Sequence, residues 1–136
     1  MFVEKRNYFT VNEANQKIPW LEVQLQAIVS LNENIERLRR DLDSIARKGH
    51  SNGHSDTGQY VVDNREKIDA AIDRLRLLAQ EISDSGIILK DAKSGLVDFP
   101  TLWEGREVYL CWHLGEPAMQ FWHEVDTGFA GRQPLL

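Results

Sequence analysis

The stretch IILKDAKSGLVDFPTLWEGREVYLCWHLGEPAMQFWHEVD, residues 87–126, decides the fold, because the spacing of apolar residues changes within it. Upstream, apolar residues recur every three or four positions, whereas here they form short alternating runs bounded by turn residues. The runs predict strands at 87–91, 96–99, 107–113 and 119–124, with Pro100 ending the second. Turns are expected at 93–95, 103–106 and 114–117. Strands joined by such short turns form a small antiparallel sheet.

The strand at 107–113 has the clearest alternation of the four. Its residues divide into one face with Val108, Leu110 and Trp112 and another with Glu107, Tyr109, Cys111 and His113. On the next strand, Trp122 falls opposite His123. The aromatic and polar residues of this half therefore cannot all line one cavity, and part of the set belongs to the core.

Residues 10–86 predict a helical hairpin. Thr10 and Glu13 have the spacing of a capping box, and Pro19 then either kinks one helix or opens a second. One apolar stripe follows from residue 21 to 45, and a second periodic run ends before Gly86, a residue suited to a left-handed helix end. Between them, residues 49–58 (GHSNGHSDTG) contain three glycines and no apolar side chain, which indicates a flexible loop.

The expected fold class is therefore α+β, in a single domain spanning residues 1–136. It comprises a long antiparallel helical hairpin at 10–86 with the loop at 49–58, the small sheet at 87–126, and an irregular tail at 127–136. The two helices have the seam spacing of a coiled coil, and their apolar stripes are wider than one partner covers. We therefore expect a homodimer through the helical seam, with any protein or small-molecule partner left open.

Composition excludes several classes of protein. The net charge of -5 is spread along the chain, so binding to nucleic acid through phosphate contacts is not expected. No apolar run approaches the ~20 residues that a membrane helix requires, so no membrane association is expected. Cys111 is the only cysteine and has no intramolecular disulfide partner, which favours the reducing cytoplasm.

Large rings and carboxylates concentrate near the C-terminus: three of the four tryptophans and seven of the twelve aromatic residues lie from Phe99 onward. Because an unpaired buried carboxylate is costly, this density predicts a site. The candidate ligand-binding residues are Asp98, Arg106, Glu107, Glu116, Trp122 and Arg132. The candidate metal ligands are Asp98, Glu116 and His123, since carboxylates with an imidazole suit zinc, manganese or iron, and a divalent metal is the candidate cofactor.

Each of these candidates has a structural alternative. His123 is equally suited to a hydrogen bond with a carboxylate inside a packed sheet, and the two arginines to internal ion pairs. Cys111 and His113 share a strand face, but the strand rise separates them by about 7 Å, too far for direct proton transfer. His50 and His54 have helical metal spacing but lie in the glycine-rich loop, where no helix would hold both imidazoles on one face.

Several short motifs carry a resemblance to a known family. They are residues 86–91 (GIILKD), 95–100 (GLVDFP) and 105–112 (GREVYLCW), the pairs Gly115–Glu116 and Trp122–His123, and residues 128–135 (GFAGRQPL). Together they resemble a bacterial family of small proteins described as domain of unknown function 2203. The resemblance covers the full chain and implies a cytoplasmic location and this architecture. The family has no assigned activity, so the resemblance carries no catalytic residue over to this chain.

Two functional hypotheses stay open, and the sequence does not decide whether the protein is an enzyme. The first is a non-catalytic, cytoplasmic, oligomeric interaction or regulatory protein, with the aromatic sheet as a docking surface. The second is a metal- or small-ligand-dependent enzyme, with the carboxylates and His123 converging beneath the glycine-rich tail. The sequence has neither a GxxxxGKS/T nor a GxGxxG nucleotide-binding motif, which favours the first hypothesis.

Overall fold

Two long helices and a five-stranded antiparallel sheet make up the computed structural model, which describes residues 7–48 and 55–135. The elements, in chain order, are α1 (Val11–Lys48), α2 (Ser55–Asp84), β1 (Ile88–Asp91), β2 (Leu96–Trp103), β3 (Arg106–His113), β4 (Phe121–His123), a 3₁₀ turn η1 (Phe129–Gly131) and β5 (Gln133–Pro134). The strands follow one another in the sheet in the order of the sequence. The α+β class is confirmed.

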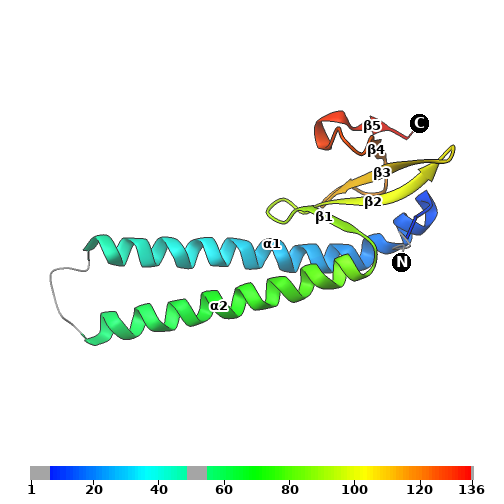
Figure 1. Cartoon of the computed structure of the whole chain (residues 1–136). Coiled ribbons are helices and arrows are strands. Elements are labelled where there is room, and N and C mark those ends of the chain that lie inside the picture. Colours follow the sequence, from blue (N-terminus) through cyan, green and yellow to red (C-terminus); the bar gives the residue numbers. More distant parts are fainter. Residues whose placement is uncertain (1–6, 49–54, 136) are drawn as a thin grey trace, which may run out of the picture.

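The sheet lies across only one end of the helical hairpin (Figure 1). It sits over the start of α1 and the end of α2, while the end of α1 and the start of α2 project away from it. None of the described helices is both long and apolar enough to cross a membrane.

The capping box predicted at the start of α1 is confirmed. The amide of Thr10 donates to Glu13 Oε1 at 3.0 Å, and the amide of Glu13 donates to Thr10 Oγ1 at 3.1 Å. These two bonds satisfy amides that a helix start otherwise leaves without partners. Of the two alternatives at Pro19, the continuous helix is observed, since α1 runs through this residue to Lys48.

The second helix begins earlier and ends as the sequence indicates. α2 starts at Ser55, so the last four residues of the expected loop at 49–58 are helical, while 49–54 lie outside the described residues. Gly86 follows the helix with φ of 90°, a left-handed conformation that suits glycine. A Cβ at this position would also lie 3.0 Å from the Asn7 side chain, a tight contact that adds to the preference for glycine here.

The core lies between the hairpin and one face of the sheet, which we call the inner face. Its fully buried side chains on β2 and β3 are Val97, Phe99, Leu110 and Trp112, and they join one cluster with helix residues from Ala14 to Ile28 and with Leu78 and Ile82. A second, smaller cluster consists of Ile35, Leu38, Ile68 and Ala71, all from the helices. The sheet therefore adds a packed layer to the core at one end of the hairpin only.

The prediction that Pro100 ends the second strand is wrong. β2 continues through Pro100 to Trp103, and Pro100 stands opposite Tyr109 of β3. The carbonyl of Pro100 accepts a hydrogen bond from the Phe9 amide at 2.8 Å, so the backbone polar edge of Pro100 faces away from β3. Its missing N–H therefore interrupts no bond between β2 and β3.

The C-terminal part also differs from expectation. β4 covers three residues, Phe121–His123, instead of the expected 119–124. The tail expected to be irregular contains η1 and a two-residue strand, β5, which pairs antiparallel with β4. A strand this short has no periodicity to detect, and Pro134 within it is a residue that disfavours strands.

We predict that Thr10→Ala lowers the free energy of unfolding by about 1 kcal/mol, because it removes the side-chain acceptor of the capping box. Glu13→Gln is the matched control, since glutamine keeps an acceptor oxygen at the same position and should cost less. Urea denaturation followed by circular dichroism measures both variants. Equal losses for the two would contradict a reciprocal box.

Candidate functional site

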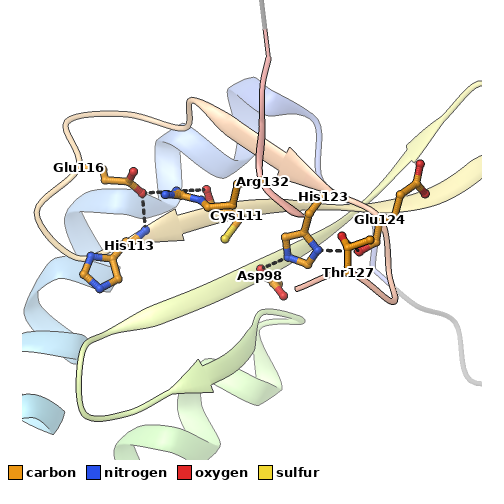
Figure 2. Close-up of polar contacts among 8 residues, drawn as sticks. All are labelled: Asp98, Cys111, His113, Glu116, His123, Glu124, Thr127 and Arg132. Atoms are coloured by element: carbon orange, nitrogen blue, oxygen red, sulfur yellow. Dashed lines mark hydrogen bonds and ion pairs between the residues drawn. The ribbon is translucent and has the colours of Figure 1, made fainter. Parts of the chain in front are cut away.

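The face of the sheet turned away from the hairpin carries a buried polar cluster. The register places Asp98 of β2 opposite Cys111 of β3, and His123 of β4 opposite Tyr109 of β3. Directly paired residues of antiparallel strands project from the same face. Figure 2 shows His123 pointing toward Asp98, with the Cys111 sulfur beside them. Asp98, Cys111 and His123, which we call the buried cluster, are each no more than 1% exposed.

The imidazole of His123 is held at both nitrogens. Nδ1 lies 2.6 Å from the backbone carbonyl of Glu124, and Nε2 lies 2.9 Å from Asp98 Oδ1. A carbonyl only accepts, so Nδ1 carries a proton. The contact between Nε2 and Oδ1 requires a second proton, located either on the imidazole or on the carboxyl group. The pair is therefore an imidazolium with a carboxylate or a neutral imidazole with a carboxylic acid.

Two features of the buried cluster are unusual for a hydrogen-bonded core. Asp98 Oδ2 is buried and has no hydrogen-bond partner. Burial, together with the negative charge of Asp98, raises the pKa of the Cys111 thiol to about 12. The thiol is therefore protonated near neutral pH and is a poor nucleophile.

The three residues of the buried cluster could also hold a metal ion. Each residue offers one ligand atom, and these three atoms lie within 4.8 Å of one another.

A second set of contacts fastens the tail to the sheet. Arg132 donates to Glu116 Oε1 at 2.6 Å and to the Cys111 carbonyl at 3.2 Å. The same oxygen of Glu116 accepts the amide of His113 at 2.6 Å. The guanidinium also lies 4.0 Å from the centre of the Phe121 ring, within cation–π range. Arg132 thus ties the tail to β3, to β4 and to the turn between them.

The structure divides the residues predicted for the site into separate groups. Asp98 and His123 meet, and Glu116 and Arg132 meet, but these are two different contacts (Figure 2). The metal set expected from the sequence is therefore not assembled, because Cys111, not Glu116, adjoins Asp98 and His123.

The other ligand-binding candidates lie elsewhere. Arg106 forms an exposed ion pair with Glu124 at 2.5 Å, and Glu107 stands opposite Leu102 near the β2–β3 turn. Trp122 projects from the inner face, with its ring 4.8 Å from that of Trp103. Cys111 was not among the metal ligands expected from the sequence. The sequence placed Cys111 on the same face of its strand as Tyr109. That placement identifies Cys111 as a neighbour of Asp98 only when the pairing of β2 with β3 is known.

An apolar cavity of about 370 Å³ opens on the inner face, beyond the start of α1. Leu102, Trp103, Trp122 and Leu135 contribute to its lining. Trp112 is fully buried in the core, so the three tryptophans do not share one wall. The sheet separates this cavity from the buried cluster, because the residues that line it on β3 and β4 belong to the inner face.

The hairpin, the sheet and the closed polar cluster define a small α+β protein with no open catalytic cleft at these residues. A family model described as "Uncharacterized conserved protein (DUF2203)" matches residues 7–135, and the chain belongs to this family. No curated protein and no solved structure matches the chain. Function must therefore be argued from the residues themselves.

The two arginine–glutamate pairs offer a direct test of how the tail is held. We predict that Arg132→Ala lowers the free energy of unfolding by about 2 kcal/mol, because it leaves the mostly buried Glu116 carboxylate without its charged partner. Arg106→Ala, at the exposed pair with Glu124, should cost no more than about 0.5 kcal/mol. Chemical denaturation measures both. Losses of similar size would contradict the anchoring role of Arg132.

Proposed function

We propose that this protein is a non-catalytic interaction protein that assembles as a homodimer through its projecting helices. The distal arm, defined as residues 35–48 of α1 and 55–72 of α2, extends past the strands of the sheet (Figure 1), and the β1–β2 turn reaches only its start, where Lys93 pairs with Glu36 at 3.2 Å. The proposal rests on the different cores at the two ends of the hairpin. Two helices alone form the core of the arm, whereas the sheet covers the other end.

Packing favours a further layer on the distal arm. Two helices bury one stripe each against one another and leave their flanks in water. Leu42 and Ile72 sit partly exposed at the margin of the small core, and Tyr60 and Val62 are 46% and 49% exposed. A second hairpin packed against one side of this arm would make a four-helix bundle and cover the apolar side chains on that side.

Charge favours a second copy of the chain as the partner. Residues 35–48 contain five basic and three acidic residues, whereas residues 55–72 contain two basic and four acidic ones. In a symmetric dimer, α1 of one subunit can pack beside α2 of the other, so surpluses of opposite sign meet. The arm is thus complementary to itself.

The alternative function is a metal- or small-ligand-dependent enzyme that uses carboxylates and His123. Burial weighs against it, since Asp98 and His123 are each 1% exposed and a substrate must reach the reacting groups. A cytoplasmic location is part of the proposal, because Cys111 is a free, buried thiol and a reducing compartment preserves it.

We predict that light scattering at micromolar concentration gives the mass of a dimer for the wild-type chain. Tyr60 and Val62 lie on opposite sides of α2, so the double variant Tyr60→Asp/Val62→Asp places charge on whichever side forms the interface and should shift the mass to that of the monomer. Val125→Asp is the matched control, since Val125 is also exposed, at 45%, but lies in the tail. A monomeric wild type, or equal effects of the arm and tail variants, would contradict the proposal.

A further inference from the structure

We propose that the buried cluster is a closed binding site for a divalent transition-metal ion of the zinc class, with Asp98, Cys111 and His123 as its ligands. The site is independent of the proposed dimer, because all three residues lie on the face of the sheet turned away from the hairpin, which we call the outer face, and none belongs to the distal arm. Four observations support it, and each concerns a different property of the cluster.

The first is the chemical nature of the donors. A thiolate, an imidazole nitrogen and a carboxylate are the ligand types that zinc takes in proteins, whereas magnesium and calcium take oxygen ligands. Bonds of about 2.0–2.3 Å to zinc place tetrahedral donors roughly 3–4 Å apart. The donor atoms of the cluster lie within 4.8 Å of one another, so binding requires the thiol to approach and the 2.9 Å contact between Nε2 and Oδ1 to open to the spacing of two metal ligands.

The second is the orientation of His123. Its Nδ1–H donates to the Glu124 carbonyl at 2.6 Å, which fixes the tautomer and turns Nε2 into the cluster. A histidine that binds a metal commonly donates its other ring N–H to a backbone carbonyl in this way. Because Glu124 directly follows His123, the chain supplies this support locally.

The third is the orphaned oxygen of Asp98. Oδ2 is buried and has no partner at hydrogen-bond distance, while the same carboxyl group interacts with the His123 ring and the Cys111 thiol. An ion coordinated by both oxygens of Asp98 removes this deficit. The two oxygens, Nε2 of His123 and Sγ of Cys111 then supply four donor atoms from three residues, in a geometry distorted from the tetrahedron because one carboxylate provides two of them.

The fourth is the balance of charge. On binding, the ion displaces the thiol proton of Cys111 and the proton shared by His123 and Asp98, and both protons pass to solvent. The remaining ligands are a thiolate, a carboxylate and a neutral imidazole, whose two negative charges neutralise a divalent cation. A buried site without net charge avoids the cost of an uncompensated charge in the interior.

Cobalt(II) is a suitable probe, because it occupies zinc sites and its bond to a thiolate gives a charge-transfer absorption band. The experiment uses chelator-treated, untagged full-length protein in a His50→Gln/His54→Gln background, which removes the two loop histidines as a competing site. We expect one equivalent of cobalt(II) to produce the band and zinc(II) to abolish it by displacement. Zinc(II) at one hundred times its Kd should lower the unfolding equilibrium constant about 100-fold.

Three variants distinguish this site from adventitious binding. Cys111→Ser should lose the charge-transfer band, and His123→Gln should lose at least tenfold in cobalt affinity, as expected for a ligand. His113→Gln is the matched control, because it removes another imidazole of the same sheet that lies outside the cluster, and it should behave as the parent does. No stoichiometric binding by the parent, a band that survives Cys111→Ser, or a loss in His113→Gln would each overturn the proposal.

The ligand variants are at risk of failing to fold, since all three side chains are buried. X-ray absorption of the zinc-loaded parent protein avoids this difficulty. It should show one sulfur at about 2.3 Å from zinc among nitrogen and oxygen ligands. A zinc environment of nitrogen and oxygen alone would overturn the proposal, because Cys111 is the only cysteine.

Discussion

The antiparallel register of β2 and β3 is the constraint on which the rest of the structure depends. It pairs Phe99 with Leu110 and Asp98 with Cys111 on adjacent steps, so one set of side chains packs on the hairpin and the other faces away from it. A shift by one residue would exchange the two faces and place Asp98 in the apolar core. The apolar core and the polar cluster are therefore two consequences of one pairing, and neither can change without the other.

The tail packs against the outer face of the sheet, where the Phe129 ring lies 6.2 Å from that of His113. A sheet with one face on a helical layer ordinarily leaves its other face to water, and polar side chains there remain hydrated. Here Arg132 ties the tail to Glu116 and to the Cys111 carbonyl, and Glu124 supplies the acceptor for His123. The chain that follows β4 thus fixes the imidazole at Glu124 and holds the tail on β3 through Arg132.

Local features of the fold could be predicted from the sequence, while features that depend on pairing could not. The capping box at Thr10, the stop at Gly86 and the opposite faces of Trp122 and His123 follow from spacing within a few residues. The neighbour of Asp98 depends on which residue of β3 stands opposite, and that pairing runs through Pro100, a residue that usually ends strands. Glu116 was expected beside Asp98 and His123, whereas the turn folds its carboxylate back onto the His113 amide and Arg132 binds it there.

The contact between Asp98 and His123 depends on the strand register, and both residues belong to the proposed metal site. A double-mutant cycle with Asp98→Asn, His123→Gln and the combined variant measures their coupling in the free energy of unfolding. Because both side chains are buried and bonded at 2.9 Å, a coupling of about 1–3 kcal/mol is predicted in metal-free protein. Strictly additive losses would show that the two side chains do not meet, and would contradict the register and everything built on it.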